Sequence, residues 1–211
     1  MKHVEGPITR NTKLLGRKEK LLNNIKGKCL DIGCGEGELL IKATLLGHDI
    51  IGIDSSLREI EVAKKTALIS GVEINIKHGY IEDLPFEKDQ FDTIIMGEVI
   101  EHLPNVGETV KRVLTFLKDG GQLLITTPAG FAHADADHKN FFFKREVMEK
   151  LSKYWVFDFL PKMWLSIHRI VILDNFFDPI SDDVSIEEIE YGDSKHASLD
   201  FFIKVKKRLT R

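Results

Sequence analysis

A glycine-rich turn between an apolar run and an amphipathic pattern restricts this chain more than any other feature. Within the segment LDIGCGEGEL, glycine recurs at Gly33, Gly35 and Gly37. Asp31 comes two residues before this turn, and Asp54 comes twenty-one residues after Gly33, at the end of a second apolar run. Glycines let the backbone approach a ligand closely, and an acid about 20 residues later is typical of a ribose contact in an α/β fold. The pattern therefore predicts a nucleoside site at the ends of two strands.

The charges beside this turn disfavour a phosphate ligand. A dinucleotide site of the form GxGxxG has a glycine where this chain has Glu38. Glu38 and Asp31 would both repel a pyrophosphate at the start of the following helix. A nucleoside that carries an ammonium group fits better, because Asp31 can pair with the ammonium while Asp54 accepts from the ribose hydroxyls.

Apolar strands and amphipathic helices alternate along the first two thirds of the chain. We expect helices at 12–26, 38–46, 57–70 and 106–117, a turn at 119–121, and strands at 28–33, 48–54, 72–79, 91–97, 121–128, 153–161 and 198–208. This order predicts an α/β fold with a doubly wound, mostly parallel seven-stranded sheet and an insertion before the last strand. A rival interpretation makes residues 168–174 the seventh strand.

Composition favours one domain over the whole chain. The 211 residues are 43% hydrophobic, enough for a full core. We divide residues 1–211 into four parts, namely an N-terminal helical segment (1–26), a cofactor-binding core (27–160), an insertion or cap (161–197), and a last strand with a basic tail (198–211).

The charge pattern bears on the partner and the location. A net charge of −3 is not that of a dedicated nucleic-acid binder, and we interpret the acidic run at 182–193 and the basic tail from residue 204 as solvated. Cys29 and Cys34 lack metal-type spacing, so we expect both to be reduced and the protein to be cytoplasmic. Since no apolar run reaches about 18 residues, we expect neither a secretion signal nor a transmembrane segment.

Five stretches resemble, in the same order, the class I S-adenosylmethionine-dependent methyltransferases. They are LDIGCGEG, GIDSS, IEDLPF, FDTIIMGEVIEHL and LKDGGQLLITTP. The resemblance implies a Rossmann-like fold, S-adenosylmethionine as the cofactor, and methyl transfer by direct displacement. The implied cofactor-binding residues are Asp31, Gly33, Cys34, Gly35, Gly37, Asp54, Ser55, Tyr80, Ile81, Glu82 and Gly97.

The resemblance also assigns parts of the cofactor to these residues. Asp31 and the glycines border the methionine end, and Asp54 binds the ribose. Glu82 or Asp83 borders the adenine together with the backbone near Ile81. Tyr80 stands where relatives often have an acid, and it could stack on the ring instead.

The segment EVIEHL offers a second group of polar side chains. Glu98, Glu101 and His102 have spacing i, i+3, i+4, which a helix would place on one face. His133, Asp135, Asp137 and His138 follow the fifth strand. A mixed set of carboxylates and imidazoles suits Mg²⁺, Mn²⁺, Fe²⁺ or Zn²⁺.

This arrangement resembles the metal clusters of ubiquinone-biosynthesis O-methyltransferases and of small-RNA terminal 2′-O-methyltransferases. The candidate ligands are Glu98, Glu101, His102 and His138, with Mg²⁺ or Mn²⁺ as the metal. Two alternatives remain open: His102 is a catalytic base or substrate contact without a metal, or the segment is structural. In the latter case the aromatic run at 140–143 begins a helix.

The leading hypothesis is O-methylation of a small-molecule acceptor. The alternatives are a metal-dependent RNA 2′-O-methyltransferase, against which the charge argues, and a non-catalytic S-adenosylmethionine-binding protein. The aromatic stretch at 162–177 is compatible with plain core, a substrate pocket, a membrane-facing patch or a homodimer interface.

Overall fold

The computed structural model describes residues 6–14, 16–83, 86–129, 137–143, 169–172, 184–191 and 200–209. In chain order its elements are α1 (Arg17–Asn23), β1 (Cys29–Ile32), α2 (Glu38–Leu45), β2 (Ile50–Asp54), α3 (Leu57–Ile69), β3 (Asn75–His78), the 3₁₀ turn η1 (Ile81–Asp83), β4 (Phe91–Gly97), the 3₁₀ turn η2 (Ile100–His102), α4 (Val106–Thr115), β5 (Leu117–Pro128), β6 (Asn140–Phe143), β7 (Arg169–Ile172), β8 (Val184–Tyr191) and β9 (Asp200–Lys207).

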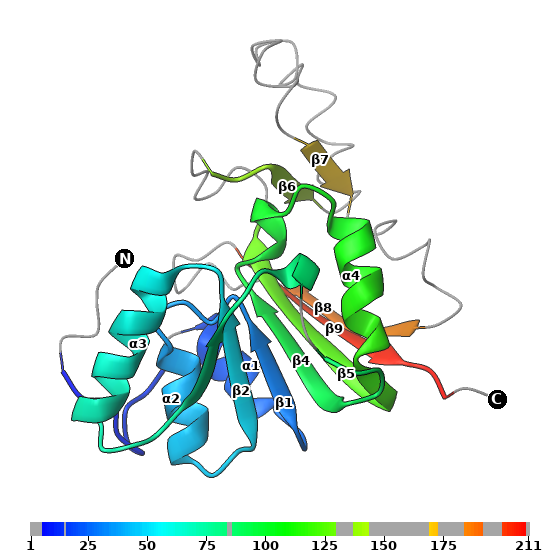
Figure 1. Cartoon of the computed structure of the whole chain (residues 1–211). Coiled ribbons are helices and arrows are strands. Elements are labelled where there is room, and N and C mark those ends of the chain that lie inside the picture. Colours follow the sequence, from blue (N-terminus) through cyan, green and yellow to red (C-terminus); the bar gives the residue numbers. More distant parts are fainter. Residues whose placement is uncertain are drawn as a thin grey trace.

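Seven strands form one sheet in the order β3-β2-β1-β4-β5-β9-β8 (Figure 1). The pairs among β1 to β5 are parallel, while β9 is antiparallel to β5 and β8 is antiparallel to β9. The prediction of a mostly parallel, doubly wound sheet is confirmed. The strand order reverses between β1 and β4, and open α/β sheets bind ligands at the carboxyl ends of their strands beside such a reversal.

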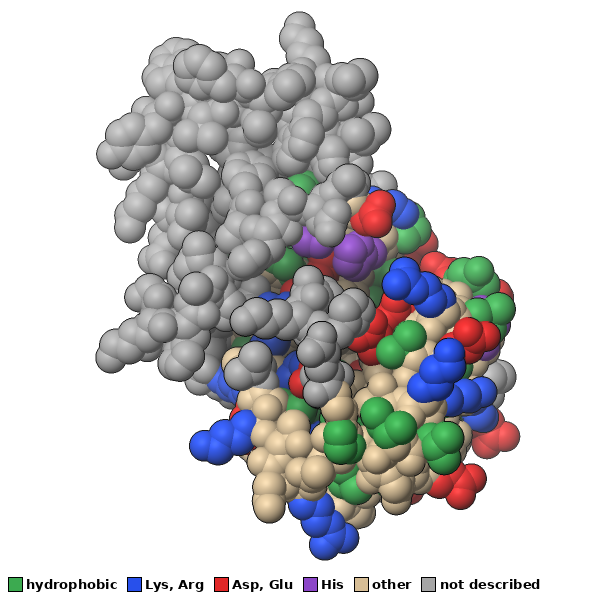
Figure 2. All heavy atoms as spheres, turned by 90° about the vertical axis from the view of Figure 1, so that its left-hand side faces the viewer, with side chains coloured by type: hydrophobic (Ala, Val, Ile, Leu, Met, Phe, Trp, Pro, Cys, Tyr) green, Lys and Arg blue, Asp and Glu red, His purple; other side chains and the backbone are tan. Residues whose placement is uncertain are grey.

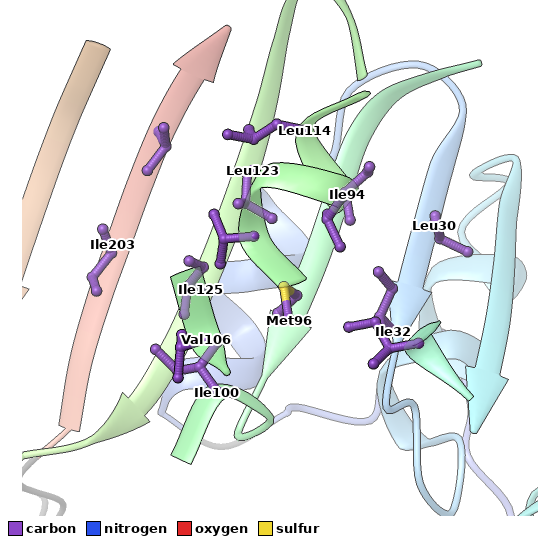
Figure 3. Packing of buried hydrophobic residues seen from close by; sticks show 14 of the residues in the cluster. Leu30, Ile32, Ile94, Met96, Ile100, Val106, Leu114, Leu123, Ile125 and Ile203 are labelled. Carbon is purple, nitrogen blue, oxygen red and sulfur yellow. The ribbon is translucent and has the colours of Figure 1, made fainter. Parts of the chain in front are cut away.

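Alternation along the strands gives the sheet two apolar faces. One face, which carries Leu30, Ile94, Met96 and Leu123, packs against Val106 and Leu114 of α4 (Figure 3). The opposite face, with Cys29 of β1 and Ile50 of β2, packs against α1 and α2. Asp31 comes two residues after Cys29, and Asp54 comes four residues after Ile50. Residues an even number of positions apart on a strand share a face, so both carboxylates project toward α1 and α2.

Local signals place the helix ends. The Ser56 side chain accepts a hydrogen bond from the backbone N–H of Glu59, and Asn105 accepts one from Glu108, so both cap helices as N-cap residues usually do. Gly47, just after α2, has φ of 89°, a left-handed conformation that favours glycine. The predicted ends of α2 and α3 are therefore correct to within one residue.

Two local predictions in the first two thirds are wrong. The helix predicted at 12–26 is shorter, because it begins only after Gly16, whose φ is 49°. The predicted turn at 119–121 lies inside β5, where Gly120 has φ of 73°. The register between β4 and β5 shifts at this point, so the glycines form an irregularity in the strand.

The last third differs most from expectation. Residues 140–143 form β6 and not the start of a helix, and β6 pairs with β7 in a separate two-stranded sheet. The described part of the segment 168–174, β7, therefore does not belong to the main sheet, and the rival interpretation is wrong. The acidic run at 182–193 contains the edge strand β8, and the basic tail begins within β9. The strand predicted at 153–161 lies outside the described residues.

Candidate functional site

The carboxyl edge of the parallel strands brings Asp31 and Asp54 to one place. β1 and β2 are neighbours in register, with Asp31 opposite Gly52. Both carboxylates project to the face covered by α1 and α2. The two acids that flank the glycine turn in the sequence therefore lie on the same side of the same sheet edge.

Asp54 is held in place by two backbone amides. Its Oδ2 accepts from the N–H of Gly35 at 2.7 Å, and its Oδ1 accepts from the N–H of Ser56 at 2.8 Å. Each carboxylate oxygen retains a lone pair for a further donor. Asp54 is thus a fixed acceptor pair of the kind that two ribose hydroxyls require.

The glycines of the turn have different reasons to be glycine. A Cβ on Gly33 would lie 2.5 Å from Cγ2 of Val99, and one on Gly37 would lie 2.8 Å from Cβ of Ala63. At Gly35, by contrast, a Cβ would meet nothing within 4 Å. Gly33 and Gly37 permit close packing, whereas Gly35 has open space in front of it, beside Asp54.

The side chain of Cys34, within the glycine turn, packs against Gly52 of β2. A Cβ on Gly52 of β2 would lie 2.9 Å from Sγ of Cys34 and 2.6 Å from Leu40. Gly52 is a residue that sequence reasoning missed, because its importance depends on which side chains press on β2. Gly97 at the end of β4 is similarly close to Leu21, at 3.2 Å for an added Cβ.

Asp31 is a buried acid whose carboxylate accepts no hydrogen bond from the described residues. It is 3% exposed, and burial raises its pKa to about 7. The ammonium of Lys18 on α1 opposes this rise, and the charge of Asp54 adds to it. Lys18 itself pairs with Glu38 at the start of α2. The site therefore contains a buried carboxylate, that of Asp31, with no hydrogen-bond donor among the described residues, and it has acids on both sides of the glycine turn.

The predicted adenine contacts lie along the continuation of β3. Gly79 donates its N–H to the carbonyl of Asp54 at 3.0 Å, which ties the end of β3 to the ribose position. Ser55, Tyr80 and Glu82 are exposed, whereas Ile81 is buried. Tyr80 lies edge-on to the ring of His78, and its 56% exposure leaves the tyrosine ring accessible for stacking.

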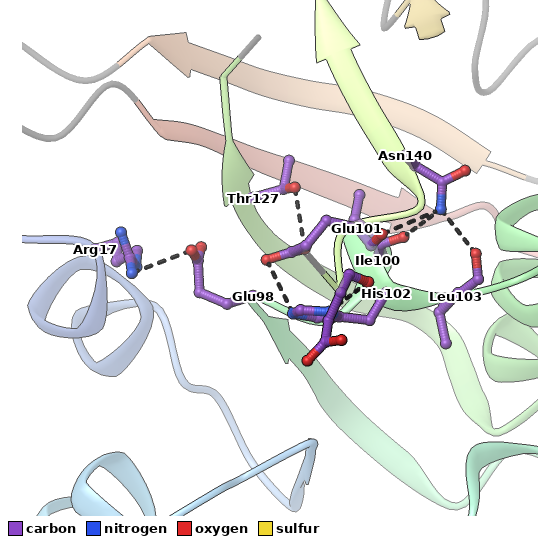
Figure 4. A network of polar contacts seen from close by, with 9 residues as sticks. Arg17, Glu98, Ile100, Glu101, His102, Leu103, Thr127 and Asn140 are labelled. Atoms are coloured by element: carbon purple, nitrogen blue, oxygen red, sulfur yellow. Dashed lines mark hydrogen bonds and ion pairs between the residues drawn. The ribbon is translucent and has the colours of Figure 1, made fainter. Parts of the chain in front are cut away.

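A second polar group lies at the same edge, next to η2. Glu101, His102 and His138 each offer a ligand atom, and these atoms lie within 4.8 Å of one another. Nε2 of His102 is 4.0 Å from Oε1 of Glu101 (Figure 4). Oε1 is buried and accepts no hydrogen bond from the described residues, while Oε2 accepts one from Thr127 at 3.1 Å. Burial, and next the charge of Glu98, raises the pKa of Glu101 to about 8.

Glu98 does not join this group. The residue has φ of 57°, and its Oε2 pairs with Nη2 of Arg17 at 3.1 Å. A continuous helix would have put Glu98 on the face of Glu101, but the helical turn begins only at Ile100. Asp137 contributes its backbone oxygen, which accepts a hydrogen bond from Nδ1 of His102 at 3.3 Å. The predicted candidates His133 and Asp135 lie outside the described residues.

Asn140 at the start of β6 fixes the position of η2, and sequence reasoning missed it. Its side-chain amide donates to the carbonyls of Leu103 at 2.7 Å, Ile100 at 3.1 Å and Glu101 at 3.4 Å (Figure 4). The neighbouring N–H of Lys139 also donates to Glu101, at 2.7 Å. These bonds bring His138 against η2, although about forty residues separate the two segments.

Comparison with known proteins agrees with this geometry. The family described as "Methyltransferase domain" matches residues 2–164, more than half of the chain. The chain belongs to this methyltransferase family. A curated relative of this methyltransferase domain is a ubiquinone biosynthesis O-methyltransferase from Chelativorans sp. (strain BNC1), 35% identical over 113 residues that cover 53% of this chain and 45% of the relative. The chain thus spans about half the length of the curated relatives that it matches.

Solved structures share the fold of the methyltransferase domain at low identity. One is a putative S-adenosyl-L-methionine-dependent methyltransferase from Methanococcus maripaludis, with a TM-score of 0.60, 21% identity, and coverage of 92% of this chain and 84% of that one. Another is the [4+2]-cyclase SpnF, with a TM-score of 0.64, 14% identity, and coverage of 90% and 80%. The second neighbour illustrates that one fold supports different reactions.

No helix in the described part of the methyltransferase domain is long and apolar enough to cross a membrane.

Proposed function

We propose that this chain transfers a methyl group from S-adenosylmethionine to a hydroxyl of a small molecule. The observation that carries the proposal is the pair of carboxylates at adjacent strand ends, one buried without a hydrogen-bond donor among the described residues and one held by two amides. Family membership and relatives that are named O-methyltransferases support it.

The residues fit the cofactor by charge and by space. An ammonium group would compensate the buried Asp31, whose pKa burial raises to about 7. Asp54 has acceptor capacity left for two hydroxyls, and the open space at Gly35 leaves room beside it. A pyrophosphate would meet Asp31 and Glu38 instead, so a dinucleotide fits poorly.

When bound, the cofactor supplies a methyl group on a sulfonium, which is a good leaving group. The chain then has to hold the reactants in line, exclude water and accept the proton of the acceptor. Correct placement of two reactants accounts for several kcal/mol of a typical barrier, up to about 7–11 kcal/mol in the best cases. His102, whose side chain is 44% exposed at the sheet edge, is the proposed proton acceptor.

As the alternative to a metal-free base, we propose that Glu101, His102 and His138 hold a divalent metal, in which case His102 is a metal ligand and not the proton acceptor. Oε1 of Glu101 is buried and accepts no hydrogen bond from the described residues, so a cation would compensate it. One carboxylate and two imidazoles suit Mn²⁺, Fe²⁺ or Zn²⁺ better than Mg²⁺, which prefers oxygen ligands. A bound metal would lower the pKa of an acceptor hydroxyl.

The charges favour a small acceptor over RNA. Lys204 and Lys206 of the basic tail both pair with Glu187, and Lys207 pairs with Asp89 at 2.7 Å. Each of these lysines therefore has an acidic neighbour, which weakens the attraction of the tail for phosphates. We further propose that residues 1–211 act as one domain, because β8 and β9 complete the sheet that β1 begins. The cytoplasmic location stays a prediction.

Titration calorimetry tests the cofactor. We expect binding of S-adenosylmethionine and its demethylated product, and none of NAD. Asp54→Asn should weaken binding, whereas Asp49→Asn, the same change at an exposed position, should not. Binding of NAD alone would contradict the proposal.

Transfer of a labelled methyl group tests the reaction. The substrates are a panel of phenols and catechols and an RNA fraction, assayed with chelator and then with added Mn²⁺ or Mg²⁺. We expect label in the phenolic fraction, restored best by Mn²⁺, and loss of activity in His102→Ala but not in His48→Ala. Label in RNA would favour the alternative acceptor, and cofactor binding without transfer to any fraction would favour a non-catalytic protein. Activity unchanged by chelator would contradict the metal.

A further inference from the structure

Two neighbouring threonines near the end of β5 differ in their surroundings. The side chains of Thr126 and Thr127 are both fully buried. The hydroxyl of Thr127 donates a hydrogen bond to Oε2 of Glu101 at 3.1 Å. Oγ1 of Thr126, by contrast, has no hydrogen-bond partner among the residues that the structure describes. The polar role of Thr127 therefore depends on its position and not on its residue type.

The alternation of side chains along β5 explains this difference. Thr127 comes two residues after Ile125 (Figure 3), so it shares the face of the sheet whose core also contains Ile100 of η2. Thr126 comes two residues after Leu124, which packs with α1 and α2 on the opposite face. Only Thr127 can therefore reach the η2 segment that carries Glu101.

The hydrogen bond from Thr127 determines which oxygen of Glu101 remains for a further partner. An ionised carboxylate only accepts hydrogen bonds, so the hydroxyl is the donor. Oε2 is engaged in this way, while Oε1 is buried and accepts no hydrogen bond from the described part of the chain. Nε2 of His102 lies 4.0 Å from Oε1 (Figure 4). The remaining carboxylate oxygen is thus the one that lies beside the imidazole.

The imidazole of His102 is oriented in a comparable way. Its Nδ1 lies 3.3 Å from the backbone oxygen of Asp137. A carbonyl oxygen only accepts, so Nδ1 carries the proton and the lone pair of the neutral ring is on Nε2. The rings of His102 and His138 meet edge-on with their centroids 4.8 Å apart. Each ligand of η2 therefore has a partner outside the cluster that fixes its orientation.

The cluster lies partly at the surface and partly beneath it. The side chain of His102 is 44% exposed, whereas that of Glu101 is 2% exposed. Figure 2 shows histidine side chains at the surface of the face that it presents. An ion held by this cluster would therefore meet solvent on the side of His102 and the protein interior on the side of Glu101.

We propose that Thr127 is a positioning residue for the divalent metal, because its hydroxyl holds Oε2 of Glu101 and thereby directs Oε1 toward His102 and His138. The inference rests on the proposed metal site and extends it to a residue that acts only through a ligand. Partners of this kind orient metal ligands, and losing one typically lowers metal affinity about 10- to 100-fold. Without the hydroxyl, Oε2 would also become a second buried oxygen that lacks a donor.

Electron paramagnetic resonance of Mn²⁺ bound to the whole chain, without a methyl acceptor, tests the proposal. Thr127→Val keeps the shape of the side chain and removes the hydroxyl, so we expect the affinity for Mn²⁺ to fall about 10- to 100-fold. Thr127→Ala, which also lacks the hydroxyl, should show a similar loss, whereas Thr127→Ser should keep most of the affinity. Thr126→Val makes the same change at the neighbouring buried position and should leave the affinity unchanged.

Circular dichroism verifies that each variant is folded, and the affinity of Thr127→Val for S-adenosylmethionine should equal that of the wild type. If Thr127→Val binds Mn²⁺ as tightly as the wild type, the inference is overturned and the metal site stands. A serine variant as weak as the valine variant, or a Thr126→Val control that is equally weak, also overturns it, because the hydroxyl is then not the cause. A wild-type chain that binds no Mn²⁺ overturns both the inference and the metal site.

Discussion

Replacing Asp31 by asparagine should stabilise the free protein and abolish cofactor binding. The carboxylate is 3% exposed, and burial raises its pKa to about 7 from the ordinary value of 3.8. Asparagine has nearly the same shape and carries no charge. The variant therefore separates the cost of the buried charge from the packing of the side chain.

The magnitude follows from the linkage between pKa and stability. Between about pH 4 and pH 7 the folded protein keeps the Asp31 proton that the unfolded chain has lost, so the free energy of unfolding falls as the pH rises. A pKa raised from 3.8 to about 7 corresponds to about 4 kcal/mol, fully expressed only above pH 7. We expect Asp31→Asn to regain about 1–4 kcal/mol at pH 8 and almost nothing at pH 4.

Urea unfolding of both proteins at pH 4 and pH 8, without ligand, measures this difference. Asp49→Asn changes an exposed carboxylate and serves as the control. Asp31→Asn should also lower the affinity for the cofactor by more than about a hundredfold, since removing one partner of a buried ion pair costs roughly 3–5 kcal/mol. An Asp31→Asn protein that is less stable than wild type at pH 8, or equally shifted at both pH values, would refute the reasoning from burial.

Three further predictions concern the same edge of the sheet. Gly33→Ala should cost roughly 1–3 kcal/mol in urea unfolding, because its Cβ would lie 2.5 Å from Val99 at a φ of 71°; Val99→Ala should recover part of that loss. Asp54→Asn should weaken cofactor binding about ten- to a hundredfold in calorimetry and cost about 1 kcal/mol in urea unfolding, because an asparagine NH₂ group cannot accept one of the two backbone N–H groups that the carboxylate accepts. Asn140→Ala should destabilise the fold by about 2–4 kcal/mol and weaken Mn²⁺ binding, measured by electron paramagnetic resonance, because buried carbonyls around η2 lose their donor.

The sequence predicted the positions of residues that depend only on neighbouring residues in the chain. The glycine turn, Asp31 and Asp54 occupy the predicted strand ends, because a buried parallel strand and a capped helix are both local patterns. Glu98 shows where this reasoning stops. Its spacing to Glu101 predicts a shared helical face, but a left-handed backbone at Glu98 delays the helical turn and sends the side chain to Arg17.

Residues that act across the fold were not predictable from one sequence. Asn140 contacts η2 from about forty residues away, and nothing in its own segment indicates three carbonyls in need of a donor. β8 lies in a stretch whose acids suggested a solvated face, because an edge strand can expose one side of its backbone and charged side chains to water. Its pairing with β9 depends on the long-range register.

The amino-acid sequence by itself determined the α/β class, the first five strands and the two acids around the glycine turn, because hydrophobic periodicity, helix caps and glycine conformations depend on neighbouring residues. Only the tertiary structure decided which strands are adjacent, which face each acid uses, and that Glu101, His102 and His138 meet at one edge. The physical reason is that strand order and register arise from burial and hydrogen bonding between distant segments, and these interactions leave no periodic trace in the chain.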